Sequence, residues 1–189
     1  TKTNNQLASL GLDTWGVDFG LLDRQNHLIG NPYHYRDGRT DGMVEEAYRI
    51  LPKEEIYDQT GIQFMQLNSL FQLFAMAKQN SIALQSADCF LTIPDLINFW
   101  FTGRKVNEYS NATTTQCYDT RRNVWAADVL AILGIPTRIF GEVVHPGTVI
   151  GSLSEAIAAD CEVQSITVIV PACHDTGSAV AAVPAVVSV

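Results

Sequence analysis

The chain has 189 residues, of which 47% are hydrophobic and 17% charged, so it is long enough to fold as one domain with a substantial core. Its formal net charge of -8 argues against a nucleic acid or an anionic bilayer as partner, because both are negatively charged themselves. No stretch approaches the roughly 20 apolar residues that a membrane helix needs, so a membrane protein is excluded as well.

The cysteines and the two ends of the chain set further limits. Four cysteines are present without a C-x-x-C pair, so neither a zinc knuckle nor a redox pair is indicated, and a reducing cytoplasm is the expected compartment. Residue 1 is Thr rather than Met, and the chain stops in the apolar run 185–189, which a surface tail seldom carries. We therefore expect a piece of a longer protein.

The first 80 residues predict strands and then helices. Apolar runs bounded by turn residues predict strands at 9–13, 17–22 and 27–35, and consecutive strands suggest a meander within a mixed sheet. Apolar spacing and terminal residues predict helices at 41–51, 53–60 and 68–79, with Gly61 closing the second and Asn68 as the N-cap of the third. The apolar stripe of the third helix is expected in the core.

The rest of the chain alternates helical and strand-like segments. A helix is predicted at 94–102, with Pro94 in its first turn and Gly103 at its end, and another at 125–133, ending at Gly134. The β-branched run 165–171 predicts a strand buried on both faces, followed by a short helix over 178–183. Without a repeat or linker, the chain is predicted to form one α/β unit, a mixed sheet flanked by helices.

An acid and a base follow directly after the strand predicted at 165–171. His174, Asp175 and Thr176 fall at the carboxyl end of that strand, where open α/β sheets bind ligands. Asp175 is therefore our first candidate for a catalytic carboxylate. The spacing is equally compatible with Asp175 or Thr176 merely capping the next helix by accepting its free backbone N–H groups.

A second polar cluster, Asp13-Thr-Trp-Gly-Val-Asp18, lies at the turn between the first two predicted strands. Gly16 would let a ligand approach the backbone closely, and Trp15 could pack against the nonpolar face of a sugar ring. The simpler alternative is a tight turn with a buried Trp. The segment Arg36-Asp-Gly-Arg-Thr40 offers two guanidinium groups and a carboxylate, with a solvated loop and weak surface pairs as the alternative.

The remaining polar groups are less specific. The hydroxyl- and amide-rich stretch 107–116 would hydrogen-bond either a polyol or its own backbone. His27, His34 and His145 have no partner at metal-ligand spacing, so no metal site is predicted. The patterns G-x-x-x-x-G-K-[ST] and G-x-G-x-x-G do not occur, so the sequence predicts no standard nucleotide-binding loop within this segment.

Several motifs together carry a resemblance to a known family. They occur in the family's order and cover most of the chain: Gly11-Leu-Asp-Thr-Trp-Gly-Val-Asp-Phe19, Tyr35-Arg-Asp-Gly-Arg-Thr40, Thr60-Gly-Ile-Gln-Phe64, Glu108-Tyr-Ser-Asn-Ala-Thr-Thr-Thr-Gln116, His145-Pro-Gly-Thr-Val-Ile-Gly151 and His174-Asp-Thr-Gly-Ser-Ala179. In these motifs the chain resembles the FGGY carbohydrate kinases. The resemblance implies an actin-like, ribonuclease-H-like lobe.

The resemblance also implies a function. Residues 1–189 would be part of the N-terminal sugar-binding domain of an ATP-dependent kinase, which phosphorylates L-rhamnulose at its 1-hydroxyl. ATP and Mg²⁺ would be bound across a cleft, mainly by parts outside this segment. A first phosphate hairpin would precede Thr1 and an ATP-binding lobe would follow Val189, both packing on this lobe, so the segment alone is expected to be inactive.

The resemblance assigns roles to particular residues. Asp175 corresponds to the general base, and the sugar contacts are Gly16, His174, Asp175 and Thr176. The supporting residues that it implies are Asp18, Gln63, Asp37 and Arg39. A carboxylate within reach of the attacking hydroxyl is the part of phosphoryl transfer that this segment would supply. A kinase for another ketose such as fuculose or xylulose, and a non-catalytic sugar-binding relative, are the alternatives.

Overall fold

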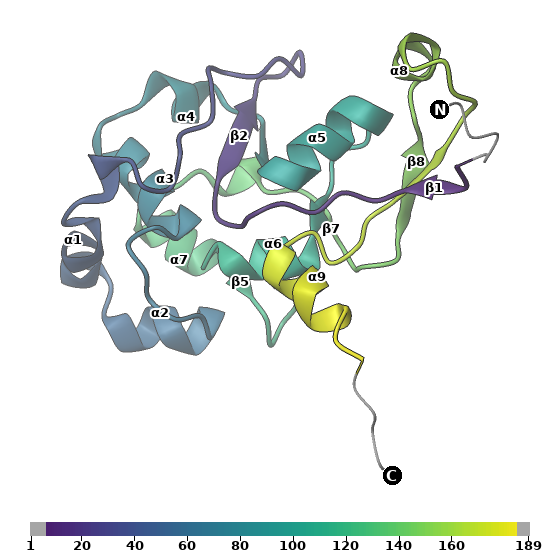
Figure 1. Cartoon of the computed structure of the whole chain (residues 1–189). Helices are drawn as coiled ribbons and strands as arrows, with labels where there is room; N and C mark the ends of the chain where they lie inside the picture. Colours follow the sequence, from purple (N-terminus) through teal and green to yellow (C-terminus); the bar gives the residue numbers. More distant parts are fainter. Residues whose placement is uncertain (1–6, 185–189) are drawn as a thin grey trace.

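The computed structural model describes residues 7–184 and has the predicted α/β architecture (Figure 1). Its three-stranded sheet has the order β1-β9-β8, in which β1 (Ser9–Leu10) is parallel to β9 (Thr167–Ile169), and β9 is antiparallel to β8 (Val149–Ser152). Strands from both ends of the chain therefore share one sheet, as the sequence predicts. The apolar run 185–189 lies outside the described residues.

Two-stranded sheets complete the strand pairing among the described residues. They are antiparallel β2 (Phe19–Leu22) and β3 (Cys89–Thr92), parallel β4 (Asn107–Glu108) and β7 (Val143–Val144), and antiparallel β5 (Tyr118–Asp119) and β6 (Val124–Trp125). Parallel and antiparallel pairs occur together, so the predicted mixed strand arrangement is confirmed.

The helices lie around these sheets. Their bounds are α1 (Met43–Ile50), α2 (Lys53–Thr60), α3 (Ser69–Lys78), α4 (Ile82–Ser86), α5 (Ile93–Thr102), α6 (Tyr109–Thr114), α7 (Ala127–Ile132), α8 (Glu155–Asp160) and α9 (Asp175–Ala181), with 3-10 turns at Gly38–Thr40 and Thr137–Ile139. In Figure 1, α1 to α4 gather on the side of the molecule opposite to β1 and β8, and α5 lies between the two groups. Among residues 7–184, no helix is long and apolar enough to cross a membrane.

The glycine and proline signals place helix ends correctly. Gly61 and Gly103 follow α2 and α5 in the left-handed conformation, and Pro94 lies in the first turn of α5. Asn68 precedes α3 as predicted, but its side chain does not cap the helix. Its amide instead donates to the Gln63 carbonyl over 3.0 Å and to Gln116 Oε1 over 2.8 Å. Asn68 therefore ties the start of α3 to a neighbouring loop.

The predicted meander is wrong. Residues 27–35 form no strand and make only an isolated bridge between Leu28 and Leu22. Gly30 has a φ of 72°, and Pro32 has no N–H to donate, so the ladder cannot continue. β2 is buried along its whole length and pairs with the equally buried β3. β3, which lies between α4 and α5, thus takes the place of segment 27–35 as the partner of β2.

The core is centred on α3. Every residue from Ser69 to Met76 is buried, and the largest apolar cluster joins α3 to β2, β3 and α7. Burying a large apolar side chain contributes roughly 1.5–3 kcal/mol, so this cluster supplies much of the stability. The predicted core role of α3 is confirmed, and its burial extends around the helix rather than along one stripe.

Candidate functional site

The segments that follow β1 and β9 run side by side. The Thr14 N–H donates to the Cys173 carbonyl over 3.0 Å, and the Asp175 N–H donates to the Thr14 carbonyl over 2.8 Å. Thr14 and His174 thereby form a parallel bridge. Because parallel strands end at the same edge of a sheet, the two polar motifs meet there. The structure thus brings together Gly16 and Asp175, which the sequence analysis found in separate motifs.

A cavity of about 670 Å³ opens at this edge, a volume suited to a small molecule. One wall comes from the segment after β1, a second from α6, and a third from the start of α9. Apolar side chains of the loop between α2 and α3 form much of the remaining lining. The residues that line these walls are Trp15, Gly16, Val17, Tyr35, Ile62, Met65, Leu67, Ser110, Thr113, Thr114, His174, Asp175, Thr176, Gly177 and Val180.

The Asp175 side chain is hydrogen-bonded at the start of α9 and also lines the cavity. It is the first residue of α9, and its Oδ1 accepts from the Thr176 N–H over 2.6 Å. The same Oδ1 lies 3.4 Å from His174 Nε2. Oδ2 accepts no hydrogen bond from residues 7–184, and the side chain is 59% exposed. Among the described residues, one oxygen is therefore hydrogen-bonded at the start of α9, while the other is available to accept a proton.

Gly16 is buried where three segments meet. A Cβ on Gly16 would lie 2.8 Å from Thr114 Oγ1 and 3.2 Å from His174 Cδ2. Real Cβ atoms essentially never show the shorter distance, so only glycine lets α6 and the His174 segment approach the first wall this closely. The shape of the cavity thus depends on the absence of a Cβ atom at Gly16.

Trp15 is an exposed wall residue. Its side chain is not buried, so the alternative of a tight turn around a buried Trp is wrong: Trp15 is 44% exposed and lines the cavity. Its Nε1 donates to Asp18 Oδ2 over 2.8 Å. Asp18 itself is buried and does not line the cavity, and burial raises the pKa of its carboxyl. Asp18 therefore orients the Trp15 ring through this hydrogen bond.

Arg39 is connected to the same wall through Gln72, and Asp37 is not. Arg39 Nη2 donates to Gln72 Oε1 over 2.6 Å, and Gln72 Nε2 donates to the Val17 carbonyl over 3.2 Å. Burial lowers the pKa of the Arg39 guanidinium. Asp37 is exposed and accepts from the Arg39 N–H over 2.9 Å, which caps the 3-10 turn. Arg39 is thus a partly buried support rather than part of a solvated loop, and neither residue lines the cavity.

Gln63 lies apart from the other site residues. Its exposed side chain lines a separate hollow beside α2, together with Lys53, Tyr57 and Phe64. The structure therefore does not bring Gln63 to the cavity that contains Asp175. His174 and Thr176, by contrast, both line that cavity.

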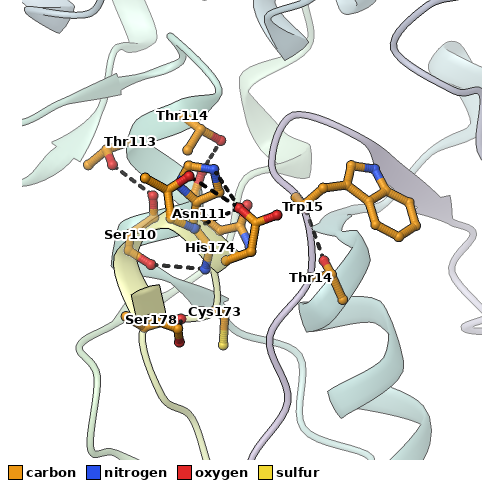
Figure 2. A network of polar contacts seen from close by, with 12 residues as sticks. Thr14, Trp15, Ser110, Asn111, Thr113, Thr114, Cys173, His174 and Ser178 are labelled. Carbon is orange, nitrogen blue, oxygen red and sulfur yellow. Dashed lines mark hydrogen bonds and ion pairs between the residues drawn. The ribbon is translucent and has the colours of Figure 1, made fainter. Parts of the chain in front are cut away.

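The α6 wall arises from the polar stretch whose role was left open. Thr113 and Thr114 donate to the carbonyls of Ser110 and Asn111, each over 2.8 Å, and Ser110 Oγ accepts from the His174 N–H over 3.2 Å (Figure 2). These hydroxyls satisfy their own backbone and still line the cavity. The density of Ser and Thr signalled this wall, but only its fold shows which of them face the site.

Two buried carboxylates next to the α6 wall were not predicted as site residues: Glu108 contacts Ser110, which lines the cavity, and Asp95 contacts Glu108. Glu108 is the N-cap of α6 and accepts from the N–H groups of Ser110 over 2.8 Å and Asn111 over 3.2 Å. Asp95 in α5 accepts from the Glu108 N–H over 3.0 Å, and the Thr92 hydroxyl donates to it over 2.5 Å. Burial raises the pKa of Asp95 to about 8. A polar residue three positions after Thr92 is a capping pattern that signals Asp95 in the sequence.

The raised pKa of Asp95 predicts a pH-dependent stability. Between about pH 4 and 8 the folded chain keeps a proton on Asp95 that the unfolded chain releases, so the free energy of unfolding falls as pH rises through this window. Asp95→Asn imitates the neutral acid and cannot ionise. Urea unfolding should show the variant gaining roughly 4 kcal/mol relative to wild type between pH 5 and 8; a difference that does not change with pH would contradict this.

Metal-binding side chains are not clustered in the described part of the chain. Within residues 7–184, no group of three or more His, Cys, Asp or Glu side chains could hold a metal ion.

A family model matches nearly the whole chain. Residues 2–182 match the FGGY family of carbohydrate kinases, N-terminal domain. The chain belongs to this family. The FGGY domain identified here therefore includes both walls that carry Gly16 and Asp175.

Curated relatives agree with this assignment. The rhamnulokinase of Oceanobacillus iheyensis is 46% identical over 179 residues, which cover 95% of this FGGY domain chain and 38% of that protein. The rhamnulokinase of Bacteroides thetaiotaomicron is 42% identical over 179 residues, which cover 95% of the chain and 37% of that protein. The chain thus spans less than two fifths of the length of these relatives.

Solved structures share the fold. A gluconate kinase from Lactobacillus acidophilus superposes with a TM-score of 0.81 at 19% identity, over 89% of this chain and 34% of that one. The Plasmodium falciparum glycerol kinase with ADP gives a TM-score of 0.74 at 19% identity, over 86% of this chain and 34% of that one. At these identities the likeness concerns the fold alone, and it confirms the predicted actin-like α/β fold of this FGGY domain.

Proposed function

We propose that the chain is the sugar-binding part of an ATP-dependent kinase that phosphorylates the 1-hydroxyl of L-rhamnulose, with Asp175 as general base. The observation that carries the proposal is the position of Asp175, at the edge of a cavity of about 670 Å³ and beside the Gly16 segment. The names of the curated relatives, at 46% and 42% identity, support L-rhamnulose as the substrate.

The proposed reaction uses the free side of the Asp175 carboxylate. Asp175 takes the proton of the sugar 1-hydroxyl while the oxygen of that hydroxyl forms a bond to the γ-phosphorus of ATP. The bond from this phosphorus to the bridging oxygen breaks, and ADP leaves. General-base catalysis of this kind contributes about a hundred- to ten-thousandfold. Because Thr176 N–H holds Oδ1, the carboxylate keeps one orientation during the transfer.

The sugar would be held by the polar side of the cavity. Ser110, Thr113, His174 and Thr176 offer donors and acceptors to its hydroxyls, and the exposed Trp15 ring offers a flat face for its C–H groups. Ile62, Met65 and Leu67 form an apolar wall that suits the methyl group of a 6-deoxy sugar such as L-rhamnulose. Asp18, which holds the Trp15 ring, and Arg39, which is linked through Gln72 to Val17, are proposed as supporting residues.

ATP and Mg²⁺ complete the proposed reaction. Mg²⁺ would offset the charge of the transferred phosphoryl group. We assign MgATP binding mainly to parts of the polypeptide outside residues 1–189, which would also pack on this lobe. The short coverage of the relatives, 38% of the first one, supports a longer polypeptide. A kinase of this kind would act in the cytoplasm, where ATP is available.

Release of ADP from MgATP, measured on the full-length polypeptide over a panel of ketoses, tests the proposal. L-rhamnulose should give a kcat/KM at least about tenfold above those of fuculose and xylulose, since one unpaired buried hydroxyl costs about 1–3 kcal/mol. A preference for another ketose would move the substrate assignment and keep the kinase. Sugar binding without release of ADP in the presence of any ketose would contradict the kinase assignment and favour a non-catalytic binding protein.

A further inference from the structure

The carboxylate of Glu108 lies beneath the segment that presents Asp175. Glu108 is fully buried, and its Oε2 accepts from the Cys173 N–H over 3.0 Å. The same oxygen accepts from Ser110 Oγ over 2.5 Å, and Ser110 Oγ in turn accepts from the His174 N–H over 3.2 Å. The two residues before Asp175 are thus both anchored to the Glu108 carboxylate, Cys173 directly and His174 through the Ser110 hydroxyl.

Glu108 has hydrogen-bond donors in place of a cation. Among residues 7–184, no ion pair includes Glu108. Its donors are the N–H groups of Ser110, Asn111 and Cys173 and the hydroxyl of Ser110. Hydrogen bonds to a charged acceptor are about twice as strong as neutral ones, and a buried charge is costly unless its donors are well placed. The carboxylate therefore defines the positions of these donors closely.

The donors belong to two different walls of the cavity. Ser110 and Asn111 start α6, whereas Cys173 belongs to the segment between β9 and α9. These walls are 65 residues apart in the sequence, and Glu108 fixes one relative to the other. Asp175 follows Cys173 by two residues, so the backbone direction at Asp175 depends on this anchor.

We propose that Glu108 is a positioning residue for phosphoryl transfer: it holds the Cys173–His174 backbone on α6 and thereby sets where the Asp175 carboxylate lies relative to the bound sugar. The inference rests on the proposed function. A displacement of about 1 Å at a reacting group can cost on the order of 100-fold in rate, whereas sugar contacts spread over several walls are less sensitive. Loss of the anchor should therefore lower kcat more than sugar affinity.

Glu108→Gln in the full-length polypeptide tests the inference. The amide keeps the shape of the side chain but replaces one acceptor oxygen with a donor, so it opposes some of the four existing donors. We expect kcat with L-rhamnulose to fall about 10- to 30-fold, with the calorimetric Kd for the sugar within about threefold and a stoichiometry near one site. Glu108→Asp keeps the charge and should recover part of the lost kcat. Glu155→Gln changes an exposed acid in the first turn of α8 and should leave kcat unchanged.

The binding stoichiometry separates positioning from folding. If kcat falls only in proportion to the fraction of molecules that bind sugar, Glu108 is merely structural and the inference is wrong. Unchanged kcat would contradict it as well. Should Glu108→Gln fail to fold, Ser110→Ala removes the hydroxyl that links Glu108 to the His174 N–H. Because this hydroxyl also lines the cavity, the sugar Kd is measured as well, and an unchanged kcat would then overturn the inference.

The wild-type assay distinguishes this failure from that of the proposed function. An active wild type with fully active Glu108→Gln contradicts the positioning role alone. A wild type that is silent with every ketose contradicts both.

Discussion

Asp175→Asn is expected to lower the kcat of the full-length polypeptide with L-rhamnulose by about a hundred- to ten-thousandfold, the usual contribution of a general base. The amide has nearly the same shape and keeps an oxygen that can accept from the Thr176 N–H, as Oδ1 does over 2.6 Å. It cannot take the proton of the attacking hydroxyl. Steady-state ADP release gives kcat, and calorimetry should show the sugar Kd within about tenfold of wild type.

Asp128→Asn is the matched control for this substitution. Asp128 is also an acidic residue in the first turn of a short helix, α7, and it is exposed. Any loss of stability from removing a charge at a helix start should appear equally in both variants. The kcat, by contrast, should be unaffected in Asp128→Asn. Near-normal turnover of Asp175→Asn would remove Asp175 from the mechanism, and a Kd change as large as the kcat change would assign it to sugar binding instead.

Gly16→Val is expected to weaken sugar binding by about 100-fold. Even the first added carbon would lie 2.8 Å from Thr114 Oγ1 and 3.2 Å from His174 Cδ2, so α6 or the His174 segment must move outward. Overpacking of this kind costs about 1–3 kcal/mol, and the displaced groups are walls of the cavity. Calorimetric titration with L-rhamnulose measures the loss.

Three further substitutions test whether the close contact is the cause. Gly141→Val is the control, because a Cβ on Gly141 meets no atom within 4 Å, and it should bind sugar as wild type does. Gly16→Ala should have a smaller effect than Gly16→Val, and Thr114→Ala should restore part of its loss by removing the hydroxyl in the way. If Gly16→Val binds sugar normally, the cavity described here is not the sugar site.

Local signals were sufficient to predict the helix ends and part of the site. Gly61 and Gly103 act through their freedom to adopt a positive φ, and Pro94 acts through its fixed φ and missing N–H. Their positions could therefore be interpreted without knowing the fold. The strand at 165–171 was also visible from its β-branched run, and a polar motif after a strand falls at a sheet edge wherever the strand pairs. The position of Asp175 at such an edge could therefore be predicted.

Long-range partners could not be predicted. The strand at 17–22 pairs with β3, about 70 residues further along, and nothing in its local pattern distinguishes that partner from the adjacent segment 27–35. The role of Glu108 likewise depends on the Cys173 N–H, which follows β9 and is 65 residues further along the chain. Gln63 belongs to a motif of the family resemblance, yet its side chain lies in a hollow beside α2. Only the folded chain shows these distances.

A structure of the full-length polypeptide with L-rhamnulose and a non-hydrolysable ATP analogue tests the central claim most directly. The account predicts the sugar in the cavity between Gly16 and His174, with its 1-hydroxyl oxygen about 2.6–3.2 Å from the Asp175 carboxylate, the reach required of a general base. The sugar bound elsewhere, or bound here with its 1-hydroxyl directed away from Asp175, would contradict it.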